Sequence, residues 1–251
     1  MSSDLISIQI LAAFGSAADR ALLREAAGLA AVPIEIAEAE VGNARHRVAT
    51  EEFDLAFVDA AASPTDLSAL MAAAKTARRP PFVVLVAAAA WEAGEFKAGG
   101  VEADGVVSKP TRIEQAKVLI DRCVKLKLPT RVLVVDDSPT MRGIVRKLLL
   151  STRFTLDIAE ADEGITALGQ IASGKFDFVL LDYNMPGLNG VETLSEIRRQ
   201  HPRVKVAIMT STQDAALAER ARAAGAIAFL RKPFYAADIE AVLSSLYGFR
   251  A

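Results

Sequence analysis

An internal repeat with a spacing of about 123 residues constrains the fold more than any other feature of this sequence. The segment FDLAFVD, which ends at Asp59, resembles FDFVLLD, which ends at Asp182, and the two aspartates are 123 residues apart. Two Lys-Pro pairs, beginning at Lys109 and Lys232, have the same spacing of 123 residues. A period this long predicts two copies of one domain rather than a solenoid.

Each copy alternates short strand-like runs with amphipathic, Ala-rich helical runs. The expected strands of the first copy are residues 5–12, 33–38, 53–59, 82–87 and 103–107, with a last helix over 111–126. Those of the second copy are residues 131–136, 155–160, 177–182, 204–210 and 226–231, with a last helix over 235–248. Parallel neighbouring strands need crossover connections, so five strand–helix units in series predict an α/β fold with a parallel sheet and helices on both faces.

The repeat also predicts the domain boundaries. With 251 residues, the chain is long enough for two ordinary domains. We expect a first domain over residues 1–126, a short linker over 127–130 in which Pro129 stops the preceding helix, and a second domain over 131–251. The Ile-Ala-Glu-Ala segments at Ile36 and Ile158 are 122 residues apart, so one residue has been gained or lost within the repeat.

Composition excludes several classes of function. The formal net charge of −2 provides no basic field, so nucleic acid is not an expected partner. Cys123 is the only cysteine, which excludes an internal disulfide and a Cys-based zinc cluster. The amino terminus lacks the basic region of a signal peptide, and the longest apolar run, residues 81–91, is too short for a membrane helix. We therefore expect a soluble cytoplasmic protein.

The second copy places chemically useful side chains where its expected strands end. Asp136 and Asp137 follow the buried first strand, Asp182 ends the third, Thr210 the fourth, and Lys232 follows the fifth. The carboxyl ends of parallel strands meet at one edge of a sheet, where open α/β folds bind their ligands. Closely packed carboxylates repel one another unless a cation such as Mg²⁺ lies between them. The pattern predicts a divalent-metal site.

Four motifs of this half, in order, resemble the receiver domain of two-component response regulators. They are VVDDS around Asp136, LLDYNMPG around Asp182, IMTS around Thr210 and KPF from Lys232, and the resemblance covers about residues 131–250. It implies two tandem flavodoxin-like (βα)5 domains of the chemotaxis-regulator type, each with strand order 2-1-3-4-5. It also implies a histidine kinase or phosphotransfer protein as the phosphoryl donor and Mg²⁺ as the cofactor.

The resemblance implies roles for individual residues. Asp182 is the expected phosphoacceptor. Asp137, Asp182 and the backbone carbonyl of Asn184 are expected to hold Mg²⁺, with Asp136 acting through water. The remaining expectations concern the phosphate and the switch: Lys232 neutralises charge, Thr210 donates to a phosphate oxygen, Phe229 turns inward, and the Lys232–Pro233 bond is cis.

The first copy has lost most of these groups. At an offset of 123 residues, Ala13 and Phe14 replace the two strand-end acids and Ala87 replaces the strand-end threonine, whereas Asp59 and Lys109 persist. One carboxylate cannot hold Mg²⁺ well. We therefore expect a degenerate pseudo-receiver that is not phosphorylated and that serves either as a folded spacer or in interaction or regulation.

Output is expected to pass through protein contacts, because no output domain is expected after the last helix. The expected surface is residues 213–246, which could also form a homodimer, and the only expected catalysis is self-phosphorylation and autodephosphorylation at Asp182. One alternative is a phosphorelay intermediate, and another is a haloacid-dehalogenase-type aspartyl-phosphate phosphatase. Against the phosphatase, Ser138 and Asn184 stand where that family requires a second acid. A third alternative makes the first copy a small-ligand or nucleotide sensor, although no phosphate-cradling Gly-rich loop supports it.

Overall fold

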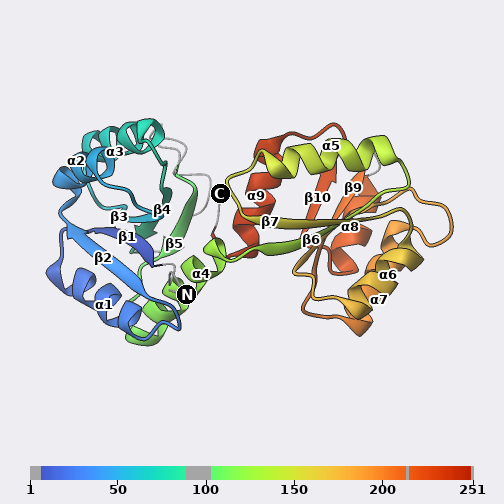
Figure 1. Cartoon of the computed structure of the whole chain (residues 1–251), viewed down its shortest axis with the longest axis horizontal. Coiled ribbons are helices and arrows are strands. Elements are labelled where there is room, and N and C mark those ends of the chain that lie inside the picture. Colours follow the sequence, from blue (N-terminus) through green and yellow to red (C-terminus); the bar gives the residue numbers. More distant parts are fainter. Residues whose placement is uncertain (1–6, 89–102, 213–214, 250–251) are drawn as a thin grey trace, which may run out of the picture. The chain divides into compact units, whose positions relative to one another are not determined.

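A computed structural model of the chain describes residues 7–88, 103–212 and 215–249. It contains two five-stranded sheets, each built only from parallel strands (Figure 1). The chain divides into two compact units. Unit 1 contains the described residues up to Lys127 together with those from Tyr247 onward, and unit 2 is Leu128–Leu246. Within the described residues, no helix is long and apolar enough to cross a membrane.

Unit 1 has the strand order β2-β1-β3-β4-β5. Its strands are β1 (Ile8–Ala13), β2 (Ile34–Ala39), β3 (Leu55–Asp59), β4 (Phe82–Ala87) and β5 (Gly105–Ser108). Its described helices are α1 (Ala17–Gly28), α2 (Val41–Thr50), α3 (Pro64–Thr76) and α4 (Ile113–Lys127). The helices pack in two pairs, α2 on α3 and α1 on α4. This pairing agrees with one layer of helices on each face of the sheet.

Unit 2 repeats this order as β7-β6-β8-β9-β10. Its strands are β6 (Thr130–Val135), β7 (Leu156–Ala161), β8 (Phe178–Asp182), β9 (Lys205–Thr210) and β10 (Ala228–Arg231). Its helices are α5 (Pro139–Leu150), α6 (Gly164–Ser173), α7 (Gly190–Gln200), α8 (Ala215–Ala223) and α9 (Ala236–Leu246). Both units therefore have the predicted α/β class and the 2-1-3-4-5 order, which confirms the fold prediction.

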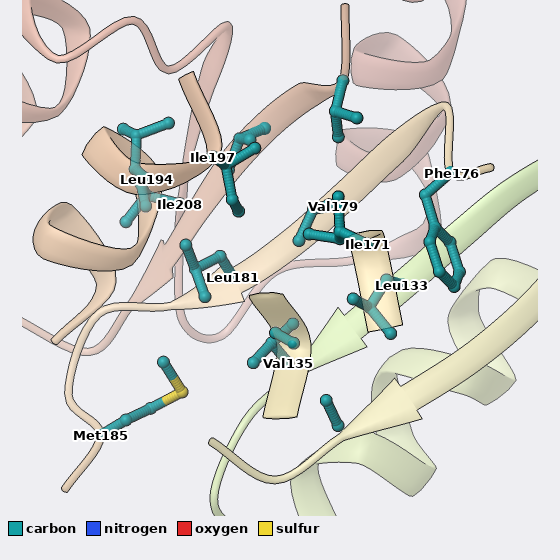
Figure 2. Close-up of a cluster of buried hydrophobic side chains, with 14 of the residues drawn as sticks. Leu133, Val135, Ile171, Phe176, Val179, Leu181, Met185, Leu194, Ile197 and Ile208 are labelled. Atoms are coloured by element: carbon teal, nitrogen blue, oxygen red, sulfur yellow. The ribbon is translucent and has the colours of Figure 1, made fainter. Parts of the chain in front are cut away.

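The sequence of the central strands explains why they lie in the middle of the sheet. The Val and Leu residues of β6 and β8 are fully buried, as expected for strands covered by helices on both faces. Leu133, Val135, Val179 and Leu181 point to the same side and pack with Ile171 and other side chains of the covering helices (Figure 2). This core holds the strand ends, and hence the site, in a fixed position.

Local signals set where the helices around the site begin. Ser138 caps α5 by accepting a hydrogen bond from the Met141 N–H, and Pro139 occupies the first turn. Asn189 caps α7 in a capping box with Glu192. At the carboxyl edge of the sheet, α5 thus begins after a three-residue loop from β6, and α7 begins after a seven-residue loop from β8.

Several boundaries of strands, helices and domains in the structure differ from those predicted from the sequence. The first strand begins at Ile8 rather than residue 5, and residues 5 and 6 lie outside the described residues. The last helix ends at Leu246 rather than 248, and the described residues that follow, Tyr247–Phe249, belong to unit 1 and not to the domain predicted over 131–251. Only Leu128 and Pro129 separate α4 from β6, so the predicted linker over 127–130 is shorter.

Candidate phosphoryl-transfer and metal site

The candidate site lies at the carboxyl edge of the unit 2 sheet. Asp136 follows β6 and Asp182 ends β8, and both carboxylates are buried, with residue exposures of 1% and 4%. Lys232, just after β10, extends its ammonium group between them. Its Nζ lies 2.7 Å from Asp136 Oδ2 and 2.7 Å from Asp182 Oδ1. Three strand ends that are far apart in sequence thus converge, as the parallel topology predicts.

Backbone N–H groups hold the other oxygen of each buried carboxylate. Asp136 Oδ1 accepts from the Ser138 N–H at 2.9 Å, and Asp182 Oδ2 accepts from the Asn184 N–H at 3.1 Å. Each carboxylate is therefore fixed by one backbone donor and one ammonium group, which satisfies a buried charge that would otherwise be costly. This arrangement orients both side chains before any ligand is bound.

Asp137 completes a group of three carboxylates suited to a cation. It is exposed, and one oxygen of each of Asp136, Asp137 and Asp182 lies within 4.8 Å of the others. Carboxylate oxygens are hard ligands of the kind that Mg²⁺ prefers, and Mg²⁺ typically keeps several waters, for which an exposed side leaves room. The donor set therefore fits Mg²⁺. The Asn184 carbonyl, expected from the sequence as a further ligand, stays a prediction.

The protonation of the site reflects burial and mutual charge. Burial raises the pKa of the Asp182 carboxyl, and the Asp136 charge adds to this, while Lys232 and the Asn184 N–H act in the opposite direction. Burial alone would lower the pKa of Lys232, but its hydrogen bonds to Asp136 and Asp182 and their charges outweigh burial and raise that pKa. Lys232 is therefore firmly protonated at neutral pH, and its charge favours the anionic form of Asp182.

The remaining predicted residues lie on or next to β9 and β10. Thr210 ends β9, is fully buried, and its Oγ1 accepts from the Thr212 N–H at 3.0 Å. Phe229 on β10 is partly buried and packs against the hydrophobic cluster shown in Figure 2. The Lys232–Pro233 peptide bond is cis, as expected from the resemblance. Of the predicted output surface, residues 213 and 214 lie outside the described residues.

Two supporting residues were missed in the sequence. Gly190, the first residue of α7, passes so close to β8 that a Cβ there would lie 2.5 Å from the Asp182 carbonyl oxygen. Arg142 on α5 donates from Nη1 to the Asp136 carbonyl oxygen at 2.8 Å and pairs with Glu160. Asn189 is a typical helix cap, so the place of Gly190 at the start of a helix is predictable from the sequence. Its close approach to β8 is not, because that depends on the path of the loop.

At the equivalent edge of the unit 1 sheet, the residues that correspond to Asp136 and Asp137 differ by one position from those predicted from the sequence. The Phe14 N–H donates to the Ala39 carbonyl as the Asp136 N–H donates to that of Ala161, so Phe14 occupies the place of Asp136. The prediction that Ala13 and Phe14 correspond to Asp136 and Asp137 is therefore wrong by one residue. Phe14 corresponds to Asp136, and Gly15 corresponds to Asp137. The cause is one extra residue in unit 2 between β7 and α6, so the offset is 122 before that loop and 123 after it.

An ion pair and an aromatic ring occupy the unit 1 edge. Lys109 Nζ lies 2.5 Å from Asp19 Oδ2 on α1 and 3.9 Å from Asp59 Oδ2 at the end of β3. Phe14 is 1% exposed, and Ala87, which ends β4, is also buried. Lys109 thus pairs closely with Asp19 and only at longer range with Asp59. In the described residues, no three-carboxylate group like that of unit 2 is found in unit 1.

Comparison with known families agrees with the geometry of unit 2. A model of the response regulator receiver domain matches residues 132–244. The chemotaxis protein CheY-3 of Vibrio cholerae serotype O1 is 37% identical over 119 residues, which cover 47% of this chain and 91% of that protein. The chemotaxis protein CheY of Pseudomonas aeruginosa is 35% identical over 119 residues, which cover 47% of this chain and 95% of that protein.

One solved structure matches nearly the whole chain. It is assigned to a two-component system response regulator/GGDEF domain protein and is 25% identical, with a TM-score of 0.50. The match covers 95% of this chain and 97% of that chain. The two chemotaxis proteins each match about half of this chain, whereas this structure matches 95% of it.

Proposed function

The chain belongs to the response regulator receiver family, and from that premise we propose that unit 2 is a signalling module that accepts a phosphoryl group on Asp182. The observation that supports this most directly is the position of Asp182 at a strand end, 2.7 Å from Lys232 and among three carboxylates that fit a divalent cation. The raised pKa of the buried Asp182 carboxyl also supports the proposal, because perturbed pKa values cluster at functional sites.

The proposed reaction transfers a phosphoryl group from a phosphohistidine. An oxygen of the ionised Asp182 carboxylate attacks phosphorus, a P–O bond forms, and the P–N bond breaks. The electron pair of the P–N bond returns to the imidazole nitrogen, which takes up a proton. Such transfers depend mainly on positioning and on neutralising charge at the phosphoryl oxygens.

The residues of the site can supply that neutralisation and positioning. Lys232 already contacts Asp182, so its ammonium group lies beside the position where the phosphoryl group would form. Thr210 uses a lone pair to accept from the Thr212 N–H, which leaves its O–H free to donate to a phosphate oxygen. Mg²⁺, held by Asp136, Asp137 and Asp182, would add positive charge that offsets the incoming phosphoryl oxygens.

We assign unit 1 a role other than phosphoacceptance. Phe14 stands at the position of the first strand-end acid and Gly15 at that of the second. This edge therefore lacks the two strand-end acids that, with Asp182, would hold a cation in unit 2. Unit 1 is proposed to serve interaction or regulation.

The proposed partners follow from this chemistry. A histidine kinase or a phosphotransfer protein supplies the phosphoryl group, and the signal leaves through protein contacts of the α8–β10–α9 surface, which can include a second copy of this chain. Beyond formation and hydrolysis of its own acyl phosphate, the protein is proposed to have no enzymatic activity.

Intact-mass measurement with Mg²⁺ and acetyl phosphate tests this proposal. We expect one added phosphoryl group on the wild type, none on Asp182→Asn, and one on Asp59→Asn, the matched substitution in unit 1. A phosphoryl group that persists on Asp182→Asn and disappears on Asp59→Asn would reverse the assignment of the units. Labelling that needs no divalent cation would contradict the metal assignment.

A further inference from the structure

The segment Tyr247–Phe249, which follows α9, is built into unit 1. α9 ends at Leu246, and Gly248 adopts a positive φ of +75°, a conformation that favours glycine and turns the chain away from the helix axis. Tyr247 and Phe249 are 8% and 1% exposed, respectively. A loose terminal segment would leave these aromatic rings in water.

Three residues of unit 1 form the seat for this segment. The Phe82 ring at the start of β4 lies 5.4 Å from the Phe249 ring, in a tilted arrangement. At Gly105, the start of β5, a Cβ would lie only 2.6 Å from Phe249 Cβ, so the fit requires glycine. Arg122 on α4 donates from Nη1 to the Gly248 carbonyl oxygen at 3.1 Å. A strand pair and a helix thus hold the segment by apolar, steric and polar contacts.

The repeat within the chain provides a comparison for this seat. At the constant offset of 123 residues in this region, the positions of Phe82, Gly105 and Arg122 are Lys205, Ala228 and Ser245 in unit 2. Lys205 is exposed and offers no aromatic surface. Ala228 carries the Cβ that the geometry of unit 1 forbids. All three seating positions therefore differ between two copies of one fold, and in unit 1 each has the residue that accommodates the segment.

We propose that this seat is an intramolecular anchor, through which unit 1 holds the carboxyl end of α9. The chain enters unit 2 at Leu128, directly after α4, and leaves it at Leu246, directly before the seated segment. At both of its ends, unit 2 is therefore joined directly to a segment of unit 1. Because only Tyr247 and Gly248 separate Phe249 from the end of α9, release of the ring frees the last turn of that helix.

The anchor gives unit 1 a regulatory task that needs no phosphorylation of its own. α9 is part of the proposed output surface, so any movement of its end must either carry the segment along or pull it from the seat. By linkage, a state of unit 2 that displaces the end of α9 weakens the seat, and a filled seat disfavours that state. This regulatory step rests on the proposed function, whereas the anchor itself does not.

Hydrogen exchange of the full chain, followed by mass spectrometry without phosphodonor, tests the anchor. In Phe249→Ala we expect amides of β4, β5 and the last turn of α9 to exchange at least about tenfold faster than in the wild type. Phe249→Leu, which keeps apolar bulk, should show a smaller increase. Gly105→Ala should release the end of α9 from the other side of the contact. Tyr235→Ala removes an aromatic ring that is 69% exposed and should leave all three regions unchanged.

Two outcomes would overturn the anchor. If Phe249→Ala accelerates exchange in β4 and β5 but not at the end of α9, Phe249 only fills the core of unit 1. If neither region responds, the segment is not seated in solution. Because no phosphoryl group is involved, these results are independent of the mass measurement that tests phosphorylation of Asp182.

Discussion

Replacing Lys232 with methionine would isolate the electrostatic role of this residue. Methionine retains much of the apolar length of the side chain and removes only the ammonium group. In the wild type this group lies 2.7 Å from both Asp136 and Asp182. Both carboxylates are buried, so the substitution leaves two neighbouring negative charges without a compensating cation. Mg²⁺ is the natural substitute for that charge.

The expected loss of stability follows from burial. Removing one partner of a fully buried ion pair costs about 3–5 kcal/mol. The Lys232 side chain retains 16% of its exposure, so water screens part of this interaction. We therefore expect a loss of about 2–3 kcal/mol in the free energy of opening of unit 2. This corresponds to exchange that is about 30- to 150-fold faster in the protected amides of β6 and β8.

Mg²⁺ and pH provide the two diagnostic controls. Saturating Mg²⁺ should stabilise Lys232→Met more than the wild type, because it supplies the missing positive charge. Lys232 normally opposes the rise in the pKa of Asp182, so its removal raises this pKa further. An acid whose folded-state pKa is raised destabilises the fold when ionised. The loss should therefore be largest above that pKa and should diminish as the pH falls through it.

The same substitution in unit 1 is the matched control. Lys109→Met removes an ammonium group whose partners, Asp19 and Asp59, have side chains that are 21% and 16% exposed. We expect a smaller loss, of about 1 kcal/mol or less, and no rescue by Mg²⁺. Equal losses in the two variants, or a loss in Lys232→Met that neither Mg²⁺ nor acid reduces, would refute this account of the site.

Three further predictions concern single residues. Gly190→Ala should destabilise unit 2 by about 1–3 kcal/mol in thermal unfolding, because its Cβ would meet backbone, whereas Gly169→Ala in α6, with nothing within 4 Å, should not. Thr210→Ala should still be phosphorylated in the intact-mass assay, but exchange of α8 should no longer respond to the phosphodonor. Burial raises the pKa of the Cys123 thiol, so an aromatic disulfide reagent should label it only when unit 1 unfolds, even at about pH 9.

The sheet order and the unit 2 site were predictable because both depend on local patterns. Short Val- and Leu-rich runs predict buried parallel strands, and a parallel sheet brings their carboxyl ends to one edge. Asp136, Asp182 and Lys232 each directly follow or end such a strand, so their convergence follows from topology alone. No side-chain detail was needed to place them together.

The missed features depend on contacts between distant residues. Asp19 lies on a helix surface, where an acidic residue ordinarily has no partner, and only the path of α1 brings it to Lys109. The sequence pattern typical of a helix continues past the end of α9 to Tyr247. Nothing in the neighbouring sequence therefore indicates that Phe249 packs beside Phe82 and Gly105, more than a hundred residues earlier. The repeat has two offsets, 122 residues before the β7–α6 loop and 123 after it. Use of the second offset throughout assigned the place of Asp136 to Ala13 instead of Phe14.

The two sheet edges differ in the charge that they place where the strands end. In unit 2, three carboxylates face one ammonium group, a formal charge of −2 that favours a divalent ion. In unit 1, Asp19 and Asp59 face Lys109, and Phe14 stands at the position of Asp136, so a single negative charge remains on partly exposed groups. A single negative charge on partly exposed groups is screened by water and needs no bound metal to compensate it. We propose that unit 1 keeps its fold without phosphoryl chemistry and uses its surface for binding roles such as seating the segment after α9.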